Sequence, residues 1–78
     1  NSDAGNNKPA LEFFEQALPL WRSLNRKREE ASTLNFLGLV HKTLGDKQQA
    51  LDNYNAALAL ARELNVRGLE ATVLNNIA

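Results

Sequence analysis

Apolar side chains recur at intervals of three and four residues along most of the chain, which is the spacing of one helix face. The clearest stretch follows Gly45, and its apolar positions are Ala50, Tyr54, Ala57, Leu58, Ala61 and Leu64. Three other segments carry the same spacing between turn-forming residues. The pattern predicts an all-α fold of four antiparallel helices joined by short turns, with no strand.

The predicted helices are bounded by residues that favour turns. Gly45 suits the left-handed conformation just past a helix end, and Asp46 is a candidate N-cap with Gln49 three residues later. Asn25 and Asn65 are expected to end their helices in a similar way. Together these signals predict a flexible tail over residues 1–6, a helix over 7–25, a helical hairpin over 28–65 and a last helix over 67–78.

The sequence repeats itself with a period of 40 residues. When residues 1–38 are placed over residues 41–78 without a gap, 13 of the 38 aligned pairs are identical. The residues with an identical partner 40 positions later are Gly5, Ala10, Leu11, Ala17, Leu18, Leu20, Arg22, Leu24, Asn25, Glu30, Ala31, Leu34 and Asn35. Periods of this size are typical of repeat proteins, so the chain is expected to be a stack of helical hairpins.

The middle of the chain resembles the tetratricopeptide repeat family, whose pattern is Trp-x2-Leu-Gly-x2-Tyr followed by Ala-x3-Phe. The corresponding residues here are Leu34, Leu37, Gly38 and His41, then Ala50, Tyr54 and Ala57. Leu34 and His41 replace the Trp and Tyr of the family, and Arg62 stands where a Pro is expected. The missing Pro fits the longer period, because the second helix of the repeat can then continue to Leu64.

This long variant is similar to the repeats of kinesin light chain and to tetratricopeptide arrays of bacterial signalling proteins. The end of the chain, residues 72–78, resembles the Thr-Leu-Asn-Asn-Leu/Ile-Ala run of kinesin light chain. The resemblance covers residues 5–78 and implies an α-solenoid fragment. In that register residues 7–25 are the second helix of one repeat, 28–65 a complete hairpin and 67–78 the first helix of another. Because the chain begins with Asn1 rather than Met, we expect it to be part of a longer protein.

Composition limits the classes of function. The chain has 9 Lys+Arg and 9 Asp+Glu, and this zero net charge argues against binding nucleic acid by neutralising phosphates. A basic cluster at Arg22 and residues 26–28 is followed at once by Glu29 and Glu30, so we interpret it as a solvated turn. The longest apolar run, residues 56–61, is too short to span a membrane. The absence of cysteine is compatible with the cytoplasmic location that we expect.

No catalytic or metal-binding pattern is present, so the sequence predicts a protein that is not an enzyme and needs no cofactor. His41 is the single histidine and lies on the packed stripe of its predicted helix, where a packing role is expected. The serines follow no nucleophile motif, and the four glycines are too widely spaced for a phosphate-binding loop. Neighbouring carboxylates such as Glu29 and Glu30 are expected to be solvated or to favour the helix N-terminus.

A second face of the predicted helices is the candidate binding surface. In the family, the first helices of the repeats line a concave wall that holds peptides or proteins. The residues predicted to bind such a ligand are Asn35, Phe36, Leu39, Lys42, Asn75 and Asn76. An asparagine amide both donates and accepts hydrogen bonds, so it can pair with a peptide backbone of any sequence. For Phe36 and Leu39, packing against a neighbouring repeat is an alternative interpretation. The charge clamp with which some members bind a terminal carboxylate is not visible at these positions.

The terminal helices are expected to expose apolar faces through which copies associate into a homo-oligomer. The residues concerned are Leu11, Phe14, Leu18, Trp21, Leu69, Val73, Leu74 and Ile77. The leading hypothesis is therefore a protein-interaction scaffold that binds a peptide or protein. The alternatives are a structural unit that stacks on copies of itself, and a regulatory arm of a signalling enzyme whose catalytic domain lies outside this sequence.

Overall fold

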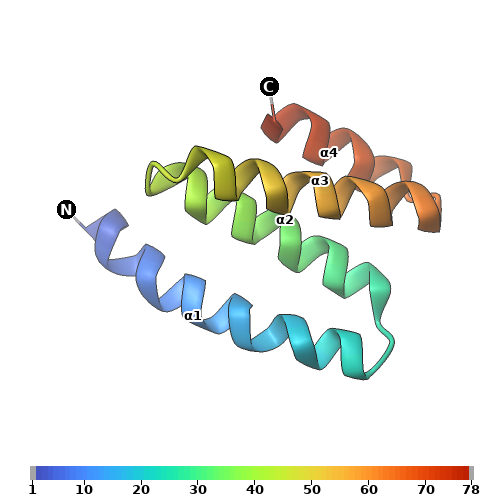
Figure 1. Ribbon diagram of the computed structural model, residues 1–78, viewed down its shortest axis with the longest axis horizontal. Coiled ribbons are helices and arrows are strands. Elements are labelled where there is room, and N and C mark those ends of the chain that lie inside the picture. Colours follow the sequence, from blue (N-terminus) through green and yellow to red (C-terminus); the bar gives the residue numbers. More distant parts are fainter. Residues whose placement is uncertain (1, 78) are drawn as a thin grey trace.

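The computed structural model describes the backbone of residues 2–77 and the side chains of residues 8–77. Its helices are α1 (Ser2–Ser23), α2 (Lys27–Thr43), α3 (Lys47–Leu64) and α4 (Arg67–Ile77), and residues 2–77 contain no strand. Each helix runs antiparallel to the one before it (Figure 1). The predicted all-α fold of four antiparallel helices is confirmed.

The three turns between the helices share one backbone arrangement. A residue one or two positions past each helix end has a positive φ: 58° at Asn25, 89° at Gly45 and 60° at Asn65. The next N–H then donates to the carbonyl five residues earlier, at 2.8 Å for Arg26 to Trp21, 2.8 Å for Asp46 to His41 and 2.9 Å for Val66 to Ala61. This is the Schellman motif, and it confirms all three predicted helix ends.

The N-cap position predicted for Asp46 at the start of α3 is confirmed, but no capping box forms there. Asp46 occupies the N-cap position, but its side chain makes no capping hydrogen bond. Asp46 Oδ2 instead lies 3.6 Å from Nδ1 of His41, in the last turn of α2. The Gln49 amide donates to Asn53 Oδ1 at 3.4 Å, so it does not reach back to the N-cap.

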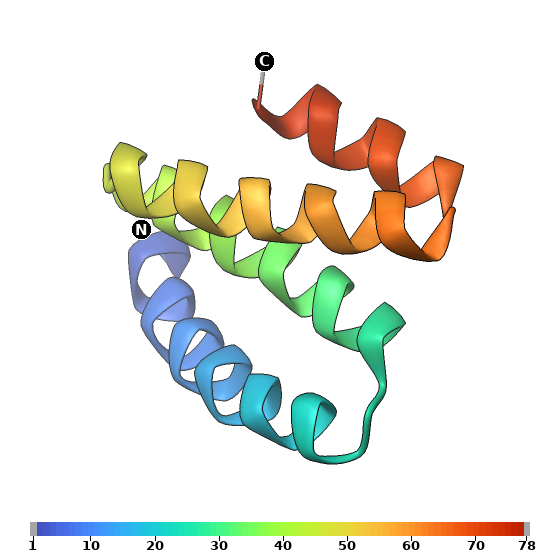
Figure 2. The same cartoon turned by 45° about the vertical axis from the view of Figure 1, so that its right-hand side comes forward.

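Helix α1 begins earlier than the sequence analysis predicts. Residues 2–6, expected to be a flexible tail, form its first turns, and Asn1 lies outside the described residues. A glycine such as Gly5 disfavours a helix by only about 1 kcal/mol relative to Ala, so it does not by itself end one. Pro9 and Pro19 lie inside the helix and cannot donate backbone hydrogen bonds. Their effect agrees with the curved path of α1 in Figure 2.

The core lies between α2 and α3, and α4 closes it on one side. Its buried members are Leu34, Ala50, Tyr54, Ala57, Leu58 and Val73. The alanines allow the helix backbones to approach closely, and Gly38 packs directly on the ring of Tyr54. A Cβ atom at Gly38 would lie 2.6 Å from Cδ1 and Cε1 of that ring. Both observations explain why the corresponding positions of the sequence pattern are small.

The 40-residue period is also visible in the side-chain contacts. Arg22 Nε donates to Glu30 Oε2 at 2.8 Å across the α1–α2 turn, and Arg62 Nε donates to Glu70 Oε2 at 3.0 Å across the α3–α4 turn. These four residues are two pairs of identical residues 40 positions apart. The same ion pair therefore braces both turns.

Candidate functional site

The six residues predicted to bind a ligand, here called the groove face, lie on α2 and α4, and Asn76 joins the two helices. Its side-chain Nδ2 donates to Asn35 Oδ1 at 3.0 Å. Its main-chain carbonyl accepts a hydrogen bond of 3.0 Å from Lys42 Nζ. Three of the six predicted residues are thus in direct contact, although 41 and 34 positions separate the bonded pairs in the sequence.

Asn35 does not have the exposed position that the sequence analysis gave it. Only 6% of its surface is exposed, because α4 covers it through the bond to Asn76. A buried amide that loses its partner is costly, so Asn35 contributes to stability as well as to the groove face. Its repeat partner Asn75 also follows a leucine, but it is exposed.

The accessible part of the groove face is both polar and apolar. Lys42 and Asn75 are exposed, Asn76 is half-buried, and Leu39 is 41% exposed. Phe36 was predicted either to bind a ligand or to pack against a neighbouring repeat, and its position is compatible with both roles. Its ring stacks on Phe14 of α1, with centroids 5.4 Å apart and an interplanar angle of 11°, yet 47% of the residue is exposed. It therefore packs within the molecule and still presents apolar surface.

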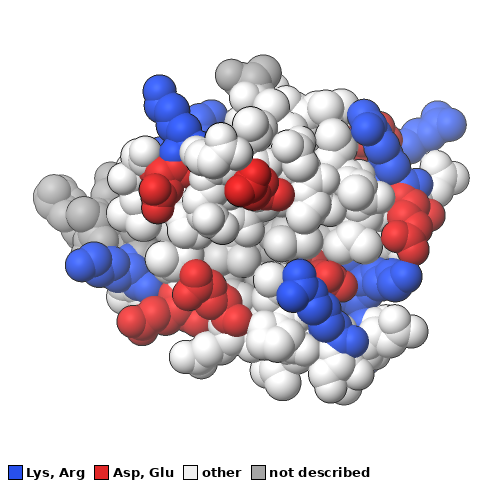
Figure 3. All heavy atoms as spheres, in the orientation of Figure 1, with Lys and Arg blue, Asp and Glu red and all other residues white. Residues whose placement is uncertain are grey.

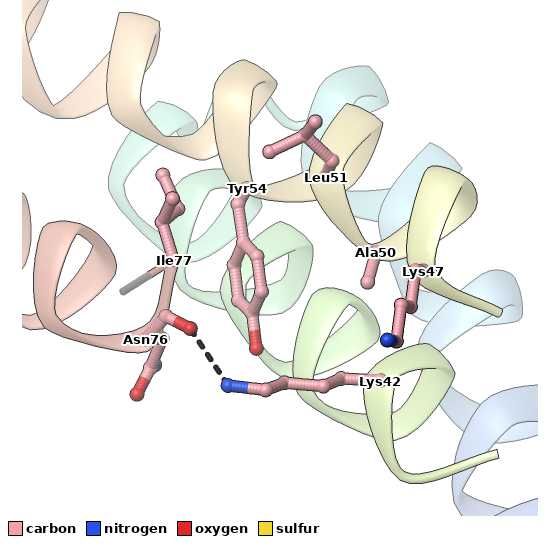
Figure 4. A pocket seen from close by; sticks show the side chains of 7 residues that line it. All are labelled: Lys42, Lys47, Ala50, Leu51, Tyr54, Asn76 and Ile77. Carbon is pink, nitrogen blue, oxygen red and sulfur yellow. Dashed lines mark hydrogen bonds between the residues drawn. The ribbon is translucent and has the colours of Figure 1, made fainter. Parts of the chain in front are cut away.

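A pocket of about 360 Å³ adjoins the groove face where α2, α3 and α4 meet (Figure 4). It is lined by Lys42, Lys47, Ala50, Leu51, Tyr54, Asn76 and Ile77. Burial raises the pKa of the Tyr54 phenol above its ordinary value, because the charged form is disfavoured away from water. The sequence analysis assigned Lys42 and Asn76 to binding but missed Lys47 and Leu51, because only the packing of three helices brings these residues together.

A second, smaller cleft of about 190 Å³ lies between α1 and α2. Its lining includes Phe13, Phe14, Trp21 and Phe36, which are four of the five aromatic residues of the chain. The sequence analysis assigned Phe14 and Trp21 to self-association and Phe36 to ligand binding. The structure shows that these residues share one cleft.

The residues predicted to mediate self-association differ in burial, and the prediction of an exposed face is wrong for Val73. Val73 is 0% exposed, because it belongs to the core. Leu18, Leu69 and Ile77 pack against that core and are partly buried, and Leu11, Phe14 and Trp21 are also partly buried. Only Leu74 is exposed, at 44%. The most exposed apolar residues of α1 and the turn after it were not predicted: they are Phe13 (65%), Leu20 (61%) and Leu24 (61%).

The remaining chemistry is sparse. His41 is buried in α2, as a packing residue is expected to be. Over the described residues, no group of three or more His, Cys, Asp or Glu side chains is placed to hold a metal ion. None of the helices described has both the length and the apolar character needed to cross a membrane. Basic and acidic side chains are interspersed on the face shown in Figure 3.

A further ionic contact joins α2 and α3. Lys27 Nζ, at the start of α2, donates to Glu63 Oε2 near the end of α3 at 2.8 Å. This hydrogen bond and the negative charge of Glu63 raise the pKa of Lys27 above its ordinary value. The contact ties the open ends of the α2–α3 hairpin together and takes no part in the groove face.

Comparison with known proteins gives one match. The family model described as tetratricopeptide repeat matches residues 2–63, which include α1, α2 and nearly all of α3. No curated protein and no solved structure matches the chain. The matched segment contains the Gly38–Tyr54 contact and the turns at Asn25 and Gly45.

Proposed function

Because the chain belongs to the tetratricopeptide repeat family, we propose that it binds a peptide or protein partner through the groove face of α2 and α4. Members of this family generally mediate protein–protein interactions, and their repeats are typically non-catalytic scaffolds. The observation that carries the proposal is the bond from Asn76 to Asn35, beside the exposed amide of Asn75.

The bond to Asn35 restrains the Asn76 side chain before any ligand arrives. Fixing a binding group in advance lowers the entropy lost on association and so favours affinity. Asn75 offers a donor and an acceptor that suit a peptide backbone, and the exposed surface of Leu39 and Phe36 suits an apolar side chain. A restrained amide at Asn76, an exposed amide at Asn75 and apolar surface together support binding with broad sequence tolerance.

Binding is tested by selecting ligands from a displayed library of random peptides and measuring their affinity for three variants. Asn75→Ala is expected to weaken binding about 5- to 30-fold, as loss of a hydrogen bond worth roughly 1–2 kcal/mol implies, with an unchanged melt. Asn35→Ala is expected to weaken binding and also to lower the free energy of unfolding by about 1–3 kcal/mol. Asn55→Ala, an exposed change on α3 outside the groove face, serves as the control and should alter neither.

The proposal fails if no peptide is selected, or if selected peptides bind Asn75→Ala as tightly as the parent chain. Equal losses of affinity in Asn75→Ala and Asn55→Ala would also contradict it, because the effect would then not belong to the groove face.

The cytoplasmic location expected from the sequence stays a prediction, as does attachment to a signalling enzyme.

Self-association is a second candidate function, favoured by the exposed apolar residues of α1 and α4. In the 40-residue repeat Leu74 corresponds to Leu34, which packs on α3 and is only 4% exposed. Likewise Ala17 and Leu18 of α1 correspond to the buried residues Ala57 and Leu58. We therefore expect α4 of one copy to pack on α1 of another copy in the way that α2 packs on α3. In the repeat Trp21 corresponds to Ala61, which is buried. Because the Trp side chain is much larger, the two helices must lie farther apart at that end of the contact.

Sedimentation equilibrium at micromolar concentration tests the association. We expect a reversible dimer or larger species that persists at high salt, because an apolar contact is not screened by ions. Phe13→Lys should shift the equilibrium toward the monomer, whereas Gln16→Lys, an exposed change of the same charge on α1, should not. A monomer at all concentrations, with a cooperative melt, would contradict self-association.

A further inference from the structure

The cleft between α1 and α2 corresponds, in the 40-residue repeat, to a surface that is covered. Eight residues line the cleft, all from α1 and α2, and moving them forward by 40 positions gives residues of α3 and α4. Five of the eight counterparts are buried: Asn53, Tyr54, Ala57, Ala61 and Val73. In the cleft itself only Thr33 is buried, and Phe13, at the position of Asn53, is 65% exposed. The repeat therefore indicates that a further helix can cover the cleft.

Helix α2 is the element that covers the counterpart surface. Leu34 of α2 belongs to one core cluster with three of the buried counterparts, Tyr54, Ala57 and Val73. Asn35, the next residue of α2, accepts the hydrogen bond from Asn76 of α4 at 3.0 Å and is left only 6% exposed. A helix that fills the cleft in the same way would carry a leucine followed by an asparagine at these two places.

Helix α4 carries these residues and leaves them uncovered. Ala71, Leu74 and Asn75 are identical to Ala31, Leu34 and Asn35, 40 positions earlier. The three residues of α2 are buried, whereas all three residues of α4 are exposed. Helices α1 and α4 lie on opposite sides of the molecule (Figures 1 and 2), so α4 can reach the cleft of another copy and not its own.

The lining of the cleft suits the leucine of that helix. Leu74 of a second copy would lie against Phe14, Ala17 and Thr33, the counterparts of the three residues clustered with Leu34. The Thr33 hydroxyl donates to the Glu29 carbonyl at 2.8 Å, so it leaves no unpaired donor in the cleft. Both copies thus bring apolar surface that is stabilised by leaving water.

We propose that α4 of a second copy occupies the cleft between α1 and α2, and that this contact removes Asn75 and Phe36 from the groove face. The proposal rests on both proposed functions, self-association and peptide binding. In the copy that supplies α4, Asn75 becomes covered as Asn35 is. In the copy that supplies the cleft, Phe36 takes the place of Asn76 as the covering residue. Self-association and peptide binding then oppose each other, and such coupling is reciprocal.

A lysine at Leu74 tests the contact from the side of α4. Leu74 is 44% exposed and lies outside the groove face, so Leu74→Lys should fold normally and sediment as a monomer. Gly68→Lys is the matched control, because it adds the same charge to the same helix. A Cβ atom at Gly68 has no neighbour within 4 Å, and its repeat counterpart Arg28 is exposed, so this variant should associate like the parent chain.

An added ion pair tests the same contact by strengthening it. Lys27 and Glu63 join α2 to α3 at 2.8 Å, and their repeat counterparts are Arg67 and Ser23. In the proposed contact Arg67 of one copy therefore faces Ser23 of the other. Ser23→Glu should tighten association about two- to fivefold at low salt, as an exposed ion pair implies, and adding Arg67→Glu should abolish this gain. Association that ignores Leu74→Lys and Ser23→Glu would overturn the proposal and leave self-association through another surface.

A peptide selected from the displayed library tests the competition. Saturating peptide should weaken association of the parent chain at least fivefold, the smallest loss expected for removing Asn75 from the groove face. At dilute concentration Leu74→Lys should bind the peptide as tightly as the parent, because its groove face is intact. Association that depends on Leu74 but is unchanged by bound peptide would overturn the competition while both proposed functions stand. A chain that binds peptide but stays monomeric at every concentration would overturn the contact and leave the groove face.

Discussion

Replacing Gly38 by alanine is expected to destabilise the protein by about 1–3 kcal/mol, the usual cost of adding a methyl group to a filled core. The added Cβ would lie 2.6 Å from two ring carbons of Tyr54 and 3.0 Å from Cγ, well inside contact distance. The ring cannot move away freely, because Tyr54 is 2% exposed and is part of the core between α2 and α3. Urea denaturation monitored by circular dichroism measures the loss.

Gly68→Ala is the matched control for this substitution. Gly68 also lies in a helix, α4, but a Cβ atom there has no neighbour within 4 Å. Alanine favours helices over glycine by up to about 1 kcal/mol, so the control should be neutral or slightly stabilising. If both substitutions change stability by the same amount in the same direction, the close approach of Gly38 to Tyr54 is not what constrains the position.

Leu34→Ala is expected to cost about 2–5 kcal/mol, the range for truncating a buried leucine and leaving a cavity. Leu34 is 4% exposed and belongs to the core with Ala50, Tyr54 and Val73. Domains of this size have a total stability of only several kcal/mol, so this one change takes away a large part of it. The melting temperature and the urea midpoint should both fall sharply.

The repeat supplies the control, because Leu74 is the residue 40 positions after Leu34. Leu74 occupies the same place in its helix but is 44% exposed, so Leu74→Ala should cost much less, about 1 kcal/mol or below. The free energies of unfolding of Leu34→Ala and Leu74→Ala, measured at low micromolar concentration and again at high concentration, also report on association. Equal losses at low concentration would show that Leu74 is buried in solution and would contradict its exposed position.

Local signals in the sequence determined the helices and their ends. Asn25, Gly45 and Asn65 were predicted as left-handed helix terminators, and each has a positive φ within a Schellman motif. Such motifs depend on a few neighbouring residues, so the sequence alone is sufficient to find them. The small residues of the family pattern were also informative, since Gly38 and the core alanines are required wherever two helices approach closely.

Only the tertiary structure decided which of several equivalent residues are buried. Asn35 and Asn75 are identical and 40 positions apart, yet the first is buried beneath Asn76 and the second is exposed. Val73 enters the core, whereas Phe13 stays 65% exposed although it is the larger side chain. The pocket that joins Lys42, Lys47 and Tyr54 has no local signal either. Helical periodicity assigns a residue to a face of its own helix, but burial depends on which other helix covers that face, and that is settled only when the helices pack.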